Sequence, residues 1–287
     1  MIIQQRNYSV FPIIEFPKKK VVNDFADPFF CCDELKLVLA HPTDSTSWKN
    51  DITSAWVKLS EITDLVEFKI TKNGENISYT PTPVLFPNEP NAWYSTIKWQ
   101  DILNSDGAGC YKLEVLYTIS GVTDSIVWGN YELKEYSQDT AKYTARLRVK
   151  FNLKQEIEGI DFTNSNVEDT IRFKGFIGLR QPNMEIDNLI YQDRVLKSVV
   201  RENLNTYEIK TDPYTSTIID QLTDLYLLSE NELYISDYNI FNNSHSILDI
   251  PVIVSESPEI DYLENYQRKS VLTCKVGDKT NNKRTHY

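Results

Sequence analysis

Glycine is scarce in this chain, with 9 residues among 287, roughly half of the usual share of about 7%. Phosphate-binding loops need clustered glycines, and the cluster Gly107-Ala108-Gly109 matches neither the P-loop nor the dinucleotide-binding pattern. A nucleophile elbow of the form Gly-x-Ser-x-Gly is also absent. The sequence therefore predicts no bound cofactor.

Histidine and cysteine are few as well. His41, His245 and His286 stand far apart and lack the paired spacing of metal ligands, so we expect no metal centre. The four cysteines, at positions 31, 32, 110 and 274, match neither a zinc site nor a disulfide framework. We expect all four to be reduced thiols.

Long apolar runs and an excess of basic charge are missing too. No stretch of 18 apolar residues occurs, and residues 1–16 lack the basic start, apolar centre and cleavage site of an export signal. We therefore expect no export and no membrane partner. A net charge of -11 argues against general nucleic-acid binding, because phosphate neutralisation needs lysine and arginine. We expect no sequence-specific nucleic-acid partner.

Two kinds of site have no fixed spacing and cannot be judged by motif. Acidic residues cluster at positions 156–169, and glycoside hydrolysis needs only two carboxyl groups at the right separation. With 41 acidic residues in the chain such clusters arise by chance, so we predict no catalytic residue and no enzyme activity. Aromatic residues beside a proline-rich loop fit either a sugar-stacking platform or core packing; they are Trp93, Tyr94 and Trp99.

What the sequence does contain is alternation of apolar and polar residues. It predicts a hairpin over residues 66–79 that turns at Asn73-Gly74, and a second over 111–133 that turns at Ser120-Gly121. Prolines at 81, 83, 87 and 90 indicate a loop or edge strand, and residues 97–103 favour a short helix. An antiparallel β-sandwich domain over residues 25–137 fits this pattern.

The second half begins after the polar connector at 137–140, and its expected span is 138–276. Alternation resumes over 143–151, and apolar residues at helical spacing after Ser216, a candidate N-cap, predict one helix near 216–229. Further strands are expected at 171–173, 232–235, 248–254 and 270–276. The predicted fold class is mainly β, with two antiparallel β-sandwich-like domains and one helix in the second. An extended N-terminal arm (1–24) and a polar C-terminal tail (277–287) complete the chain.

One set of charged residues is a candidate interface. Lys142, Arg146, Arg148 and Lys150 share one face of the strand at 142–150, opposite Leu147 and Val149. The face is either solvated or in contact with an acidic neighbouring subunit, where charge complementarity fixes register. We also expect other subunits to hold both termini, because chain ends order poorly unless they dock. The apolar residues available for docking in the arm are Val10, Phe11, Ile13, Ile14 and Phe16.

The sequence pattern of residues 105–250 resembles that of virion proteins of tailed bacteriophages of Bacteroidetes, including the crAss-like group. The segments that carry the resemblance are Gly109-Cys110-Tyr111-Lys112-Leu113-Glu114-Val115, Ser125-Ile126-Val127-Trp128, Thr144 to Phe151, and Glu158-Gly159-Ile160-Asp161-Phe162. The resemblance implies a structural subunit of a tail or head-tail connector ring, hub or baseplate. It implies assembly with other copies and neighbouring virion proteins, and location in the virion after synthesis in the host cytoplasm. The alternative is a receptor- or glycan-binding β-sandwich module.

Overall fold

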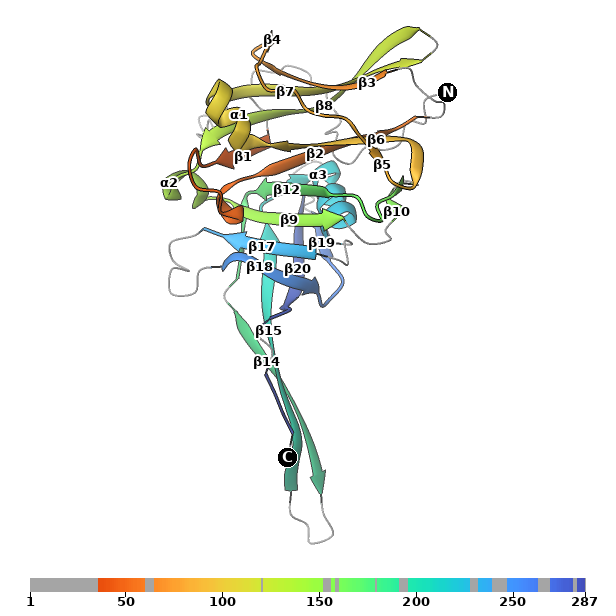
Figure 1. Ribbon diagram of the computed structural model, residues 1–287. Helices are drawn as coiled ribbons and strands as arrows, with labels where there is room; N and C mark the ends of the chain where they lie inside the picture. Colours follow the sequence, from red (N-terminus) through yellow and green to blue (C-terminus); the bar gives the residue numbers. More distant parts are fainter. Residues whose placement is uncertain are drawn as a thin grey trace.

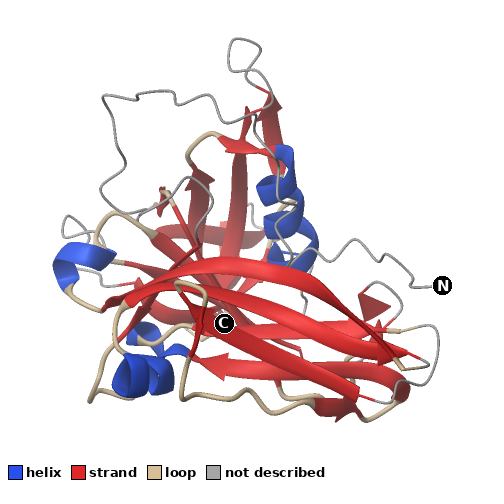
Figure 2. Ribbon diagram, turned by 90° about the horizontal axis from the view of Figure 1, so that it is seen from above, coloured by secondary structure: helices blue, strands red, loops and turns tan. Residues whose placement is uncertain are grey.

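The computed structural model confirms the mainly β fold class, with several antiparallel sheets and few helices (Figures 1 and 2). It describes residues 36–59, 65–119, 121–151, 156–157, 160–178, 180–190, 196–227, 232–238, 247–262, 269–280 and 283–286. The predicted N-terminal arm lies outside the described residues.

The first half of the chain forms two facing sheets. The larger sheet has the order β1-β8-β7-β3-β4, in which β1 runs parallel to β8 and the other pairs are antiparallel. Asn73 and Gly74 both have positive φ, as the tight turn between β3 and β4 requires, which confirms the predicted turn. The second strand is shorter than predicted, because β4 ends at Asn76. Its strands are β1 (Lys36–Ala40), β3 (Leu65–Lys72), β4 (Glu75–Asn76), β7 (Gly109–Ile119) and β8 (Val122–Glu135).

The smaller sheet has the order β2-β6-β5, with β2 (Ile52–Lys58), β6 (Glu89–Lys98) and β5 (Val84–Phe86). The edge position of β5, in the proline-rich stretch, agrees with the expected edge strand. A short 3-10 helix, η1 (Ser47–Lys49), precedes β2. The helix expected near 97–103 is α1 (Trp99–Asp106), which buries Trp99 and Ile102.

The second half forms one curled sheet with the order β12-β9-β17-β18-β20-β15-β13. Asp237 accepts a hydrogen bond from the Ile177 N–H at 2.8 Å, which ties β13 to β17. The principal strands are β9 (Ala145–Phe151), β12 (Val167–Phe173), β13 (Gly175–Ile177), β15 (Leu196–Thr211), β17 (Glu232–Asp237), β18 (Ile247–Val254) and β20 (Lys269–Asp278).

Shorter elements complete this half. The predicted helix is confirmed as α3 (Ser216–Gln221), which continues into the π-helix η2 (Leu222–Leu227). Between β8 and β9, helix α2 (Gln138–Ala141) has Ser137 as a capping-box residue. The remaining strands are β10 (Glu156–Ile157), β11 (Ile160–Asp161), β16 (Tyr214–Thr215) and β19 (Glu259–Tyr262).

The two halves meet along β2 and β12, where two hydroxyl groups replace a regular strand ladder. Thr170 Oγ1 accepts from the Ile52 N–H at 3.0 Å and donates to the Ile52 carbonyl at 2.8 Å. From the other strand, Ser54 Oγ makes the same two bonds to Glu168: it accepts from the Glu168 N–H and donates to the Glu168 carbonyl. A continuous cluster of buried apolar residues runs from the first half into the second. The two predicted domains therefore share a core across the expected boundary at 137–138.

One hairpin leaves this body. β14 (Gln181–Ile190) pairs with β15, and β21 (Lys283–His286) pairs with the opposite edge of β15. We call β14, residues 196–203 of β15 and β21 the tongue; Figure 1 shows it standing clear of the body. Ten residues of β14 span about 33 Å at about 3.3 Å each. Part of the predicted C-terminal tail thus pairs with its own chain, and whether other subunits also hold it stays a prediction.

Candidate functional site

The basic residues of β9 lie at the junction between the two halves. Arg146 is fully buried: its Nε donates to Asp51 Oδ1 at 2.7 Å, and its Nη2 donates to the Ser47 and Asn50 carbonyls at 3.0 and 3.1 Å. All of these partners precede or begin β2 in the first half of the chain. Arg146 therefore binds a surface of its own chain.

Asp51 is the centre of this junction. Arg172 on β12 lies directly opposite Arg146 on β9, an arrangement that is unfavourable for two like charges alone. The Asp51 carboxylate lies between them: Oδ1 accepts from Arg146 and Oδ2 accepts from Arg172. Oδ2 also accepts from the Leu39 N–H at 2.7 Å. One buried carboxylate thus connects β1, β2, β9 and β12.

Asp249 holds the second arginine. Its carboxylate accepts from Arg148 Nε at 2.8 Å and from Ser47 at 2.6 Å, and Arg148 also donates to Glu168 at 2.9 Å. Burial opposes the charge of Arg148, but hydrogen bonds to Asp249 and attraction to both carboxylates raise its pKa. The Arg148 guanidinium also lies 3.8 Å from the centre of the Tyr234 ring, a cation–π contact.

The backbone of Asp249 has φ of 55°, the left-handed conformation that side chains other than glycine rarely adopt. This conformation lies within the irregular pairing of β17 and β18, and the Asp249 N–H donates to Ser236 Oγ at 2.8 Å. Burial opposes ionisation of Asp249, yet its hydrogen bonds to Arg148 keep its pKa below the ordinary value. Asp249 thus places a charged carboxylate next to Arg146 and Arg148.

We call Asp51, Arg146, Arg148, Glu168, Arg172 and Asp249 the ionic junction. The interface expected at Arg146 and Arg148 is wrong, because the acidic surface that these residues contact belongs to their own chain. The two lysines of the predicted stripe lie at its ends: Lys142 pairs with Asp139 at 2.9 Å and Lys150 lies 4.0 Å from Glu232. The predicted docking residues Val10, Phe11, Ile13, Ile14 and Phe16 lie outside the described residues.

A second charged group lies inside the shared core. Asp169 accepts from Tyr226 of η2 at 2.7 Å and from the Ser54 N–H at 3.2 Å. Burial raises the pKa of Asp169 to about 6, although the charge of Lys36 opposes the rise. Burial likewise lowers the pKa of Lys36 to about 7. The pair therefore changes its charge close to neutral pH.

This cluster predicts a specific pH dependence of stability. Between about pH 4 and 6 the folded chain retains the Asp169 proton that the unfolded chain releases, so stability falls as pH rises. From about pH 7 to 10 the unfolded chain retains the Lys36 proton that the folded chain lacks, so stability rises. We expect the free energy of unfolding, relative to the double variant Lys36→Met/Asp169→Asn, to be lowest near pH 6–7.

The measurement is urea unfolding of both proteins from pH 4.5 to 9.5. The steepest slopes are expected to approach about 1 kcal/mol per pH unit on each side of the minimum. A flat difference would show that the two groups titrate as in the unfolded chain.

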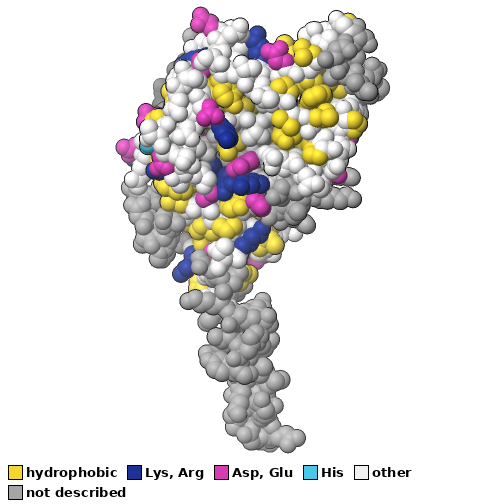
Figure 3. Space-filling model, in the orientation of Figure 1, with side chains coloured by type: hydrophobic (Ala, Val, Ile, Leu, Met, Phe, Trp, Pro, Cys, Tyr) yellow, Lys and Arg dark blue, Asp and Glu magenta, His cyan; other side chains and the backbone are white. Residues whose placement is uncertain are grey.

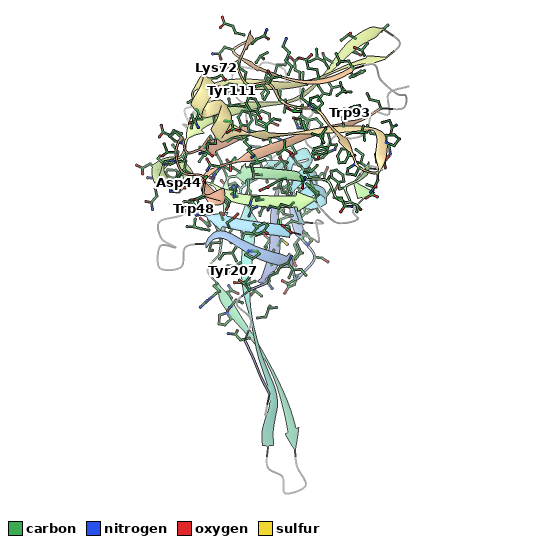
Figure 4. The ribbon with its side chains drawn as sticks, viewed as in Figure 1. Asp44, Trp48, Lys72, Trp93, Tyr111 and Tyr207 are labelled. Carbon is green, nitrogen blue, oxygen red and sulfur yellow. The ribbon has the colours of Figure 1, made fainter. Side chains whose placement is uncertain are left out.

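The other sequence candidates fall mostly into the core or into turns. Trp99 and Tyr94 are buried, and Trp93, which Figure 4 labels, is half-buried, so the three rings form no exposed platform. Among the acidic residues, Glu168 binds Arg148 and Asp161 accepts from Thr163 in a turn. Glu158 and His245 lie outside the described residues, as do Cys31 and Cys32.

Two further expectations can be compared with the structure. His41 accepts hydrogen bonds from the Thr43 and Asp44 N–H groups, as expected of a loop residue. Cys274 is a free buried thiol, but Cys110 is disulfide-bonded, so the expectation of four reduced cysteines is wrong. Within the part of the chain that the structure describes, no three His, Cys, Asp or Glu side chains form a metal-binding group.

Motif reasoning missed Asp51, Arg172 and Asp249. A signal for Arg172 was present: it alternates with Ile171 and Phe173, so the strand after β9 carries a basic residue on the same face. The two carboxylates gave no such signal, because they are 95 and 103 residues away from Arg146 in sequence.

In the ionic junction, three carboxylates balance the charge of three arginines. Each of its six charged groups has a hydrogen-bonded partner of opposite charge, and Arg146, Asp51 and Arg172 are almost fully buried. Such an arrangement fixes the relative position of the β-sheets. On the surface of the body, too, basic and acidic side chains lie side by side (Figure 3).

Comparison with known proteins adds no family assignment: no known family model and no curated protein matches the sequence. None of the helices in the described part of the chain is both long and apolar enough to cross a bilayer.

Proposed function

We propose that the protein is a non-enzymatic structural subunit of a bacteriophage virion, a ring or hub component of the tail or of the head-tail connector. Its partners are other copies of itself and neighbouring virion proteins, and its location is the virion. The resemblance of residues 105–250 to such proteins supplies the phage context.

The observation that supports this role best is the combination of a locked body with a projecting tongue. The ionic junction and the shared core join the two halves, as a building block under mechanical load requires. The tongue is a three-stranded ribbon outside that core, and so small a sheet needs a hydrophobic face or a packed layer for stability of its own. A protein that acts alone has little use for such an element, whereas a subunit covers it in the assembly.

The test is the composition of virus particles. Mass spectrometry of purified particles from a lysed host culture that carries this sequence is expected to detect the chain at one fixed copy number per particle. Labelling with antibody fragments is expected to mark the tail or its connection to the capsid. Absence from particles, while the chain accumulates in the lysate, would contradict the proposed function.

A further inference from the structure

Three aromatic side chains from separate parts of the chain meet at one side of the body. Trp48 belongs to η1, Tyr136 follows β8 and Tyr238 follows β17. The centre of the Trp48 ring lies 5.7 Å from that of Tyr136 and 6.4 Å from that of Tyr238. The three rings pack on a small apolar core that is separate from the main one. Tyr238 is buried, whereas Trp48 and Tyr136 are half-buried.

Two of these rings hold a positive charge. Lys49 Nζ lies 4.7 Å from the centre of the Trp48 ring and 5.9 Å from that of the Tyr136 ring. An aromatic face attracts a cation within about 6 Å, and tryptophan attracts it most strongly. The same ammonium group pairs with the carboxylate of Asp44. Figure 4 labels Asp44 and Trp48, which lie at the same side of the body.

The Asp44 carboxylate is fixed by its own loop. Its Oδ1 accepts from the Thr46 N–H at 2.9 Å and from the Thr46 hydroxyl. Asn50 holds the loop by donating to the Asp44 and Thr46 carbonyls at 2.6 and 3.1 Å. Hydrogen bonds from Lys49 and then from Thr46 keep the pKa of Asp44 below its ordinary value. A site whose groups are already held in place loses little entropy when a ligand binds.

Solvent reaches the charged groups of this site. The Lys49 and Asp44 side chains are 20% and 32% exposed, whereas those of Arg146 and Asp51 in the ionic junction are 0% and 1% exposed. An ion pair that solvent reaches contributes little to folding. An incoming cation therefore replaces Lys49 at a small cost, which the buried arginines do not allow.

From this geometry we propose that Asp44, Trp48 and Tyr136 form a binding site for the alkylammonium group of a ligand. Lys49 occupies the site when the chain is free, and the ammonium group of the ligand displaces it. Such a group is either an unmodified amine of the lysine type or a methylated ammonium, and aromatic faces bind both. The inference does not depend on the proposed virion role, because these side chains alone carry it.

The first experiment empties the site. Lys49→Ala removes the resident ammonium group and its stem, and it leaves the carboxylate and both rings. Butylammonium, the cation of a lysine side chain, and tetramethylammonium are titrated into parent and variant. The indole N–H signal of Trp48 is followed by NMR and assigned with Trp48→Phe. The variant is expected to bind butylammonium about tenfold more tightly than the parent, whose site is open only while Lys49 is displaced.

The two probes distinguish the sources of the group. Tighter binding of butylammonium assigns the site to a lysine-type amine, and tighter binding of tetramethylammonium assigns it to a methylated ammonium. Adding Asp44→Asn to Lys49→Ala removes the charge but keeps an oxygen acceptor for Thr46. This double variant is expected to bind either probe about fivefold more weakly than Lys49→Ala, because the ion pair is lost.

Lys142→Ala is the matched control. Lys142 also pairs with a carboxylate, that of Asp139 at 2.9 Å, and lies 5.0 Å from the centre of the Tyr143 ring. This pair has one ring instead of two, and its removal leaves Lys49 in place. The control variant is therefore expected to bind both probes as the parent does. The melting temperature of each variant is measured alongside, so that only folded chains are compared.

Neutral butanol, at the same ionic strength, shows whether the charge matters. It is expected to bind Lys49→Ala about tenfold more weakly than butylammonium, because the rings and the carboxylate attract a cation. Equal binding of butanol would overturn the proposal, since the site would then be an apolar groove. A folded Lys49→Ala variant that binds neither ammonium probe also overturns it.

The parent chain decides whether Lys49 is displaced. Equal affinities of parent and Lys49→Ala would show that the probes bind elsewhere. No binding to the parent, at a concentration about a hundredfold above the dissociation constant of the variant, would make Lys49 a permanent part of the fold. Either result overturns the proposal, whereas weaker but measurable binding to the parent supports it.

Discussion

Replacing Asp51 with alanine is expected to lower the free energy of unfolding by about 3–5 kcal/mol, the usual effect of removing one partner from a buried ion pair. The loss leaves Arg146 and Arg172 opposite each other with no carboxylate between them. It also removes the acceptor of the Leu39 N–H. In a body of this size, each kcal/mol lowers the melting temperature by roughly 2–4 °C, so a decrease of about 10 °C is expected.

Asp139→Ala is the matched control. Asp139 also pairs with a basic residue, Lys142 at 2.9 Å, but its side chain is 89% exposed. Exposed pairs contribute between zero and about 1 kcal/mol, so this variant is expected to melt within a few degrees of the parent. Equal effects of the two substitutions, measured by thermal unfolding in the same buffer, would show that the ionic junction does not hold the halves together.

The elements that local chemistry determines were predictable from the sequence. Asn73-Gly74 supplies the two positive-φ residues of a tight turn, and the alternation of β3 before it marks a strand with one buried face. Helix α3 with η2 was predictable because Ile219, Leu222, Leu225 and Tyr226 recur at helical spacing and are buried. In both cases, residues close in sequence determine the structure.

The ionic junction and the tongue were not predictable in this way. Alternation on β9 separates two faces, but it cannot tell a solvated polar face from one that a distant loop covers. Arg146 and Arg148 therefore looked like surface residues, although Asp51 and Asp249 bury them. In the tongue, both faces mix polar and apolar residues, so neither face stood out as a core face.

Replacing Trp56 with alanine is expected to destabilise both halves together, by about 3–5 kcal/mol. Trp56 on β2 is fully buried. The centre of its ring lies 5.2 Å from the ring centre of Trp128, 5.6 Å from that of Phe162 and 6.3 Å from that of Phe151. Phe151 and Phe162 belong to the second half of the chain. The cavity left by the substitution therefore removes packing on both sides of the predicted domain boundary.

Trp93→Ala is the control, since Trp93 lies on the neighbouring strand β6 but is only half-buried. A smaller loss is expected there, because less apolar surface returns to water. The loss of stability in Trp56→Phe is expected to lie between those of Trp56→Ala and Trp93→Ala. Phenylalanine keeps part of the buried ring, and the Trp56 Nε1 has no protein hydrogen-bond partner to lose.

Hydrogen exchange distinguishes a shared core from two independent ones. If the core is shared, Trp56→Ala raises the exchange rates of β2 and β6 and, by a comparable factor, those of β9 and β17, because these strands open in one cooperative unit. Independent cores predict faster exchange in the first half alone and a second melting transition at the parent temperature. That result would return the chain to two separately stable domains joined by polar contacts, the ionic junction among them. A shared response would instead mean that the two halves open as one cooperative unit around a common core.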